Sequence, residues 1–411
     1  MSQQFVVGLD IGTHAIKGVI GIARPETGGR FLKAFRVPSA GMRKGMIVDM
    51  DEASRALTKA IDEIRSVGRG TLKCVFVNIG SAQVEVKNSK GFVVVSRGDD
   101  VISQEDVDRV IQASETINLQ SNREILHAIP REYVVDGMGD IQDPIGLSGA
   151  RLEVETSIIH GFSPLIRNIH RCAEMAGFKV YGLVFSPLAV SQFILSKAQR
   201  DLGAVAIDLG AQTTSLAVFE EGKLIHAKVL PVGSANITND IAIGLKVPVA
   251  IAESVKIAFG AATTKDVSRK DQIDIAKVAP GFDGAVSRRF ISEIIQVRLE
   301  EILHAINAEL KKIDRQGRLP GGAVLTGGGA KMPGIIDLVK AELRLPAQIG
   351  SPSDNSALSQ GRPFKEYFDD PDMSLAAGLY AWGAGERMHR MQSPIDKSMV
   401  GMVRWLRQLL P

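Results

Sequence analysis

The chain has 411 residues and a formal net charge of +3, with 45% hydrophobic and 23% charged residues. At roughly 150 residues per domain, this length predicts two to four domains, and so small a charge gives no reason to expect a polyanionic partner. Aromatic residues make up only 5% of the chain, which argues against a stacking surface for nucleic acid, and we expect no nucleic-acid partner.

Three further features bear on the compartment. The first residues lack the basic start and apolar core of a signal peptide, and no apolar run reaches the roughly 18 residues that span a bilayer. Cys74 and Cys172 have no metal-ligand spacing and are expected to be buried thiols in a reducing compartment. We therefore expect a cytoplasmic protein whose membrane contact is peripheral.

A motif near the N-terminus recurs in the second half of the chain. Residues 5–21 read FVVGLDIGTHAIKGVIG, and residues 205–219 read VAIDLGAQTTSLAVF. A further β-rich run follows each copy, at 31–41 and at 224–234. Each copy predicts three consecutive strands joined by tight turns, so the fold is expected to be duplicated.

Strands and helices alternate in the first half of the chain, which predicts an α/β fold with helices on the sheet faces. The expected elements are a helix over 50–67, a buried strand over 71–80, a helix over 163–177, a strand over 179–185 and a helix over 187–198.

Each half is expected to carry an insert. The first, 81–160, contains a predicted hairpin over 82–96, a helix that begins at Ser103 with Asp106 completing a capping box, and two later strands, enough for an α+β subdomain. The second, 236–301, reads as largely helical. The first half then comprises 1–80 and 161–199, and the second comprises 200–235 and 302–385.

The repeated Asp-x-Gly turns predict a phosphate site. An Asp and a Gly that follow a buried strand place a carboxylate beside backbone N–H groups, which cradle phosphate oxygens. Asp10 and Asp208 would hold Mg²⁺ through water, and Lys17 would point at the phosphates. A third glycine cluster, Gly327–Gly329, follows another buried strand and would let a flat ligand such as adenine approach the backbone.

These three loops, 8–21, 206–214 and 325–333, resemble the ATP signature of the actin, sugar kinase and chaperone ATPase superfamily. Residues 186–193 and 374–383 resemble its connecting helices. Within the superfamily the chain is similar to the FtsA family of bacterial cell-division proteins over essentially its whole length. This similarity depends mainly on the position of the first insert, which begins at Ser81, one strand later along the chain than in actin.

The resemblance implies ATP and Mg²⁺ as cofactors and a set of residues around them. Glu253 and Lys256 form either part of the nucleotide site or an ordinary exposed helical pair, and His14 either donates to a phosphate or is a surface histidine. The implied set is Asp10, Gly12, Thr13, His14, Lys17, Asp208, Gly210, Thr213, Glu253, Lys256, Gly327, Gly328 and Met332.

Ser186 stands where chaperone and rod-shape ATPases carry a glutamate that positions the attacking water. A hydroxyl is a poor general base at neutral pH. We therefore expect at most slow ATP turnover, with nucleotide acting as an assembly switch and no catalytic residue assigned.

The last residues predict a membrane anchor. A polar linker over 386–397, interrupted by Pro394, precedes an amphipathic helix over 398–411 with two arginines on its polar side. The alternative is a helix that docks on its own protein. The predicted membrane-facing residues are Met399, Met402, Val403, Trp405, Leu406, Leu409 and Leu410.

The resemblance also implies partners: the C-terminal peptide of the tubulin-like protein FtsZ, further copies of this chain in a filament, an anionic membrane surface and other divisome proteins. Arg298 aligns best with a family arginine that contacts the FtsZ peptide, with Arg288 and Arg289 as weaker candidates. The expected function is an actin-like ATP-binding protein that tethers FtsZ filaments to the inner face of the cytoplasmic membrane at the division site. The alternatives are a pilus or secretion assembly ATPase and a small-molecule kinase.

Overall fold

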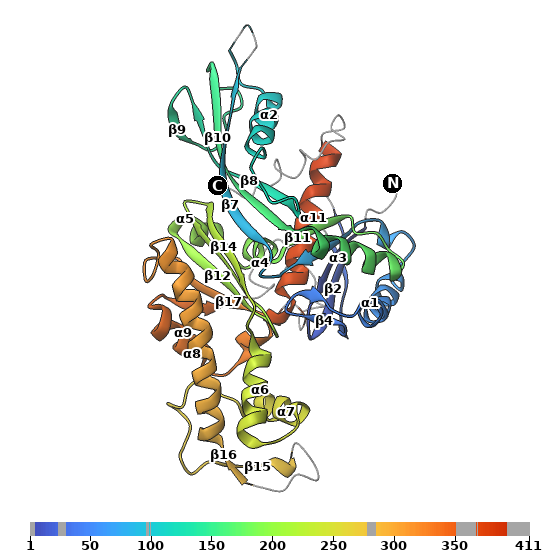
Figure 1. Cartoon of the computed structure of the whole chain (residues 1–411), viewed down its shortest axis with the longest axis vertical. Coiled ribbons are helices and arrows are strands. Elements are labelled where there is room, and N and C mark those ends of the chain that lie inside the picture. The colour runs from blue at the N-terminus through green and yellow to red at the C-terminus, as the bar shows by residue number, and fades with distance from the viewer. Residues whose placement is uncertain are drawn as a thin grey trace.

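The computed structural model describes residues 5–23, 30–95, 98, 100–277, 285–350, 367 and 369–392. Two five-stranded sheets organise the molecule (Figure 1). Their orders are β3-β2-β1-β6-β11 and β14-β13-β12-β17-β18, each with three antiparallel strands followed by two parallel ones. The duplicated three-strand unit expected from the sequence is therefore confirmed. The strands are β1 (Phe5–Ile11), β2 (Ala15–Ile22), β3 (Arg30–Pro38), β6 (Val75–Ile79) and β11 (Gly182–Phe185), and β12 (Ala204–Leu209), β13 (Thr214–Glu220), β14 (Lys223–Leu230), β17 (Gly322–Thr326) and β18 (Ala347–Ile349).

Helices cover both sheets. Helices α1 (Met50–Arg65) and α3 (Ser163–Met175) pack together beside the first sheet, and α11 (Ser374–Gln392) lies along β1. Helix α1 has its apolar residues at helical spacing and begins where the Asp49 carboxylate accepts the Glu52 N–H at 2.8 Å. Helix α4 (Ser186–Ile194) packs on the second sheet and against α11.

Strand β12 of the second sheet has small residues on one face and bulky residues on the other. Along β12, Ala204 and Ala206 point to the core that contains α4, whereas Val205 and Ile207 point to the core under α8 (Arg288–Lys312) and α9 (Ile335–Leu343). Alternate strand residues face opposite sides of a sheet, so β12 contributes to both cores.

Glycine allows α4 and α11 to touch through their backbones between the sheets. A Cβ on Gly378 would lie 2.1 Å from the carbonyl oxygen of Ala189, and one on Gly8 would lie 2.3 Å from that of Ala376. The two halves are therefore joined by a crossing that only glycine permits at these positions.

The two inserts lie at opposite ends of the molecule (Figure 1). The first forms a sheet in the order β7-β10-β8-β9, with α2 (Gln104–Ser114) packed on it and a core of its own. Asp106 accepts the Ser103 N–H at 2.9 Å, as the predicted capping box requires. The strands are β7 (Glu85–Val94), β8 (Arg123–Val135), β9 (Met138–Ile141) and β10 (Arg151–Phe162).

The predicted hairpin over 82–96 is wrong. Strand β7 runs without a turn and pairs with β10 from Glu85 opposite His160 to Val94 opposite Arg151. Gly91 lies within this strand and is needed for packing, because a Cβ there would lie 2.4 Å from the Val110 carbonyl oxygen of α2.

The second insert consists of α6 (Ser234–Leu245), α7 (Val249–Phe259), the short strands β15 (Gln272–Asp274) and β16 (Ala285–Ser287), and the start of α8. Helix α8 continues past the insert and packs in the second core, so one helix serves both parts. The remaining elements are β4 (Met42–Arg43), β5 (Met46–Ile47), α5 (Lys197–Leu202) and the 3-10 turns η1 (Thr71–Lys73), η2 (Ile275–Lys277), η3 (Gly328–Lys331) and η6 (Pro371–Met373).

Two expected boundaries are corrected. The helix over 187–198 is two helices, because the Ser196 hydroxyl accepts the Gln199 N–H at 3.2 Å and starts α5. The linker expected over 386–397 is wrong for residues 386–392, because α11 continues through these good helix formers to Gln392. Residues 393–411, with all seven predicted membrane-facing residues, lie outside the described part of the chain.

Within the described residues, no helix is both long enough and apolar enough to cross a bilayer. Cys74 and Cys172 are buried free thiols, as expected.

Candidate functional site: the cleft between the halves

A cavity of about 380 Å³ lies between the two halves and is lined by both. It sits at the C-terminal ends of β1 and β12, where the two repeated turns face each other. Every residue of the predicted nucleotide set except Gly327 lines it.

The two turns have the same construction. Across the β1–β2 pair Asp10 stands opposite Lys17, and across the β12–β13 pair Asp208 stands opposite Ser215. A Cβ on Gly12 would lie 2.7 Å from the carbonyl oxygen of Ala15, and one on Gly210 would lie 2.9 Å from that of Thr213. The repeat therefore supplies two acidic turns but only one lysine.

The Lys17 side chain lies in the cleft between two carboxylates. Its ammonium lies 3.0 Å from a carboxylate oxygen of Asp10 and 2.8 Å from one of Asp372. Burial acts to lower the pKa of Lys17, but these carboxylates outweigh it and raise the pKa above its usual value, so the amine stays charged. Burial raises the pKa of the Asp10 carboxyl, although Lys17 opposes the shift.

Asp208 has a different environment. It makes no ion pair with a described residue, and burial raises its pKa to about 7, with Lys17 acting against the shift. Gly327, which has a φ of 86°, lies directly behind it, because a Cβ there would be 2.3 Å from an Asp208 carboxylate oxygen. Gly327 therefore makes room for Asp208 instead of lining the cavity.

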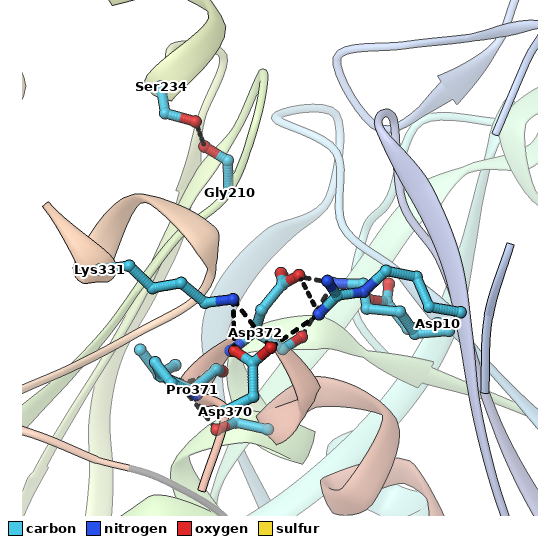
Figure 2. A network of polar contacts seen from close by, with 11 residues as sticks. Asp10, Gly210, Ser234, Lys331, Asp370, Pro371 and Asp372 are labelled. Carbon is cyan, nitrogen blue, oxygen red and sulfur yellow. Dashed lines mark hydrogen bonds and ion pairs between the residues drawn. The ribbon is translucent and has the colours of Figure 1, made fainter. Parts of the chain in front are cut away.

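Acidic and basic side chains from both halves meet beside the cavity. Figure 2 shows Asp370 and Asp372 between Lys331 on one side and Asp10 on the other. Arg36 of β3 lies 2.9 Å from Asp370 and 2.8 Å from Asp372, while Lys331 of η3 lies 2.6 Å from Asp370. This network bridges β3 of the first half and η3 of the second.

Asp372, Arg36, Lys331 and Asn78 were missed in the sequence. Asn78 is the next-to-last residue of the buried strand β6 and accepts the Ile11 N–H at 2.7 Å, so a polar residue near the end of an otherwise apolar strand was a usable signal. The other three come together only through the folded chain.

The second insert contributes a buried polar cluster. Lys256 is 7% exposed and donates to the Thr238 hydroxyl at 2.8 Å and to the Glu253 carboxylate at 2.7 Å. Ser234 at the start of α6 donates to the Gly210 carbonyl, so the insert is tied to the second turn (Figure 2). Glu253 and Lys256 therefore form the helical i,i+3 pair of the alternative, but Lys256 is buried instead of exposed.

Ser186, His14 and the glycine cluster occupy separate parts of the wall. Ser186 is buried at the start of α4, and its hydroxyl has no hydrogen-bond partner among the described residues. His14 is exposed at the rim. Gly328, Gly329 and Met332 line the side contributed by the third loop.

The three predicted partner arginines are not equivalent. Arg298 lies in a groove on the second insert, with its guanidinium 2.6 Å from Asp240 of α6. Arg288 pairs with Asp271 away from that groove, whereas Arg289 pairs with Glu293, which lines the groove although Arg289 itself does not. Of the three arginines, Arg298 alone lines this groove.

The two halves have the same strand order, and each contributes an Asp-x-Gly turn to the cleft between them. This arrangement defines an actin-like ATPase fold. Solved structures agree on the fold. The type IV pilus biogenesis complex PilM–PilN aligns with a TM-score of 0.64 at 17% identity, over 92% of this chain and 98% of that one. ADP-bound MreB5 of Spiroplasma citri aligns with 0.55 at 12% identity, over 95% and 99%. A chain of the MamK double helical filament aligns with 0.50 at 12% identity, over 92% and 98%.

Sequence comparison identifies the branch of that fold. Residues 205–378 match the family "Cell division protein FtsA", and residues 81–160 match the "SHS2 domain inserted in FTSA". The cell division protein FtsA of Borreliella burgdorferi is 35% identical over 92% of this chain and 91% of its own length. The FtsA of Bacillus subtilis is 34% identical over 86% of this chain and 80% of its own length. The FtsA of Escherichia coli is 28% identical over 99% of this chain and 97% of its own length. The chain belongs to the FtsA family of cell-division proteins.

Proposed function

We propose that this chain binds ATP with Mg²⁺ in the cleft and uses nucleotide to control its assembly on the cytoplasmic membrane, where it tethers FtsZ filaments and helps recruit the divisome. The observation that carries the nucleotide proposal is the pair of facing Asp-x-Gly turns with Lys17 between them. Backbone N–H groups of such turns and a charged amine suit a polyphosphate. ADP bound to the MreB5 relative supports the same reading.

The residues present fit a magnesium ion. Asp208 is an acidic group in the cleft that forms no ion pair with a described residue, although Lys17 acts on its charge from a distance, and Asp10 faces it from the other turn. A bound Mg²⁺ would neutralise phosphate charge while keeping most of its water shell. Asp10 and Asp208 would hold that hydrated ion, and Lys17 would orient the phosphates.

Slow turnover follows from Ser186. Its buried hydroxyl is the group that α4 presents to the cavity, and a hydroxyl does not take a proton from water at neutral pH. We therefore assign the nucleotide a switching role.

The groove around Arg298 supports the FtsZ proposal. Three apolar side chains are exposed along it, namely Ile243 (76%), Val297 (56%) and Phe290 (43%), and Arg298 stands at its side. An apolar centre with a charged rim is the composition of a peptide-binding surface. We assign it to the C-terminal peptide of FtsZ.

Membrane attachment is assigned to 398–411 on its sequence alone, and assembly into filaments would strengthen it through avidity. The MamK filament shows that a chain of this fold can polymerise. Residues 81–160 and 236–301 are then the inserts available for contacts with neighbours and partners.

The proposal is tested by co-sedimentation with anionic vesicles in ATP, comparing the full chain with one that ends at Ser393. We expect only the full chain to pellet with the vesicles. If the two chains pellet equally, residues 398–411 are not the membrane anchor.

A further inference from the structure

An open groove lies at the edge of the first sheet that is remote from the cleft. Strands β1, β6 and β11 are parallel, and the C-terminal ends of β1 and β6 reach the cleft at Asp10 and Asn78. Their N-terminal ends therefore lie at the opposite edge. The groove is lined there by Arg65 and residues 68–73, which precede β6, and by Glu174 and residues 177–181, which precede β11.

Four exposed cations surround this groove: Arg65, Arg69, Lys73 and Lys179, here called the basic rim. Glu174 is the one acidic residue among the groove's lining. Within the described residues, Arg69, Lys73 and Lys179 form no ion pair, and Arg65 lies only within 3.8 Å of Asp62. Four cations beside a single acidic lining residue give this edge an excess of positive charge, which favours an anionic surface outside the protein.

Helix α11 runs toward this same edge of the first sheet. It starts in the cleft at Leu375. Further along, a Cβ on Gly383 would touch Phe76 of β6 and Val6 near the start of β1. The helix therefore runs from the cleft toward the N-terminal ends of the strands, and Figure 1 shows it extending away from the second half. It continues nine residues past Gly383 to Gln392, about 13 Å at 1.5 Å per residue.

We propose that the basic rim contacts the headgroups of an anionic membrane when residues 398–411 lie in that membrane. The proposal rests on the anchor role assigned above. The tail leaves α11 at the edge that carries the rim, so anchoring brings this edge toward the lipid. The tail itself is an unsuitable occupant of the groove, because from Glu386 onward it holds five basic residues and two acidic ones. The rim would also set which face of the protein meets the membrane.

The test replaces Arg69, Lys73 and Lys179 by Gln together in the full chain. Binding is measured on vesicles of phosphatidylcholine alone and of phosphatidylcholine with about a quarter of phosphatidylglycerol. Each cation near an anionic surface strengthens binding about five-fold, so the triple variant should bind anionic vesicles up to roughly a hundred-fold more weakly. Its binding should also depend less on salt, and its binding to neutral vesicles should be unchanged.

The control replaces three exposed lysines of the second half and its insert, Lys265, Lys311 and Lys340, by Gln. Like the first three, they form no ion pair with described residues. This variant should bind anionic vesicles as the unmodified chain does, and both variants should unfold at the same temperature as that chain. If the two variants bind anionic vesicles equally, the proposal is overturned and the groove is left for an acidic protein segment. The chain that ends at Ser393 reports on the anchor separately, because it keeps the rim and loses only the tail.

Discussion

The ammonium of Lys17 is held by the Asp372 carboxylate at 2.8 Å, across 355 positions of sequence. Lys17 also donates to the Asp372 backbone carbonyl at 2.9 Å. Burial acts to raise the pKa of Asp372, but Lys17 and Arg36 lower it overall, so the group is a carboxylate at neutral pH. A phosphate that approaches Lys17 must compete with this carboxylate.

Asp372→Asn is expected to tighten the binding of Mg-ATP, because it removes a negative charge next to the phosphate site. We expect a gain of about three- to ten-fold, measured by calorimetric titration. Asp370→Asn is the matched control, since Asp370 pairs with Arg36 and Lys331 and does not reach Lys17. Weaker binding by Asp372→Asn alone would show that Asp372 supports the nucleotide.

The raised pKa of Asp208 predicts a pH-dependent affinity. Mg²⁺ requires the carboxylate, so affinity should rise as pH increases through the folded pKa of about 7, by up to about ten-fold from pH 6 to pH 8. Asp208→Asn should remove the part of the pH dependence that comes from Asp208 and leave the part that comes from the nucleotide itself. Identical pH profiles for the two proteins would contradict the assignment.

The raised pKa of Asp208 also makes the free energy of unfolding of the ligand-free protein depend on pH. The folded pKa lies above the unfolded value, so the folded state binds the proton more tightly. The free energy of unfolding should therefore fall as pH rises from about 4 to about 7 and level off above that. Denaturant titrations of the unmodified chain and of Asp208→Asn should differ in slope across this window.

Ser186→Ala is expected to change the rate of phosphate release by less than about two-fold, because the hydroxyl serves as no general base. The unmodified chain should itself be slow, with turnover well below the common enzyme range of about 1 per second or faster. A ten-fold loss in Ser186→Ala, at unchanged ATP affinity, would give the hydroxyl a chemical role.

The Arg298 groove predicts a separable partner defect. Val297→Glu places a charge in the apolar centre and should weaken binding of a labelled FtsZ C-terminal peptide at least ten-fold in fluorescence anisotropy. Lys311→Gln, on the same helix beyond the groove, should bind normally. Both proteins should keep their ATP affinity. Unchanged peptide binding by Val297→Glu would move the partner site elsewhere.

The crossing of α4 and α11 predicts a strong stability effect. Gly378→Ala would bring a Cβ to within 2.1 Å of the Ala189 carbonyl oxygen, so the two helices must separate, at a cost of about 3 kcal/mol in the free energy of unfolding. Gly139→Ala, where the nearest atom is 3.9 Å away, should be close to neutral. Chemical denaturation of both variants measures the difference.

The duplicated turns were predictable because the signal is local. A buried strand, an Asp, a Gly and a second strand lie within a few positions, and the copy at Asp208 repeats the pattern at Asp10. The network around Asp372 was not predictable. Arg36, Lys331 and Asp372 come from separate elements, and nothing in their local sequence marks them as neighbours.

Local signals also misled where tertiary contact decided the outcome. Gly91 resembles a turn residue, yet it lies mid-strand so that α2 can approach β7. Likewise, the polar residues from Glu386 onward resemble a linker, but α11 extends through them to Gln392.

The most direct test of the central claim, an ATP-dependent tether between FtsZ and the membrane, is a three-component sedimentation. FtsZ filaments, this chain and anionic vesicles are combined, and the fraction of FtsZ that pellets with the vesicles is measured. We expect FtsZ to pellet only when the full chain and ATP are both present, and FtsZ without its C-terminal peptide to stay in solution. If FtsZ stays in solution while the chain itself pellets with vesicles and ATP, this chain does not tether FtsZ to the membrane.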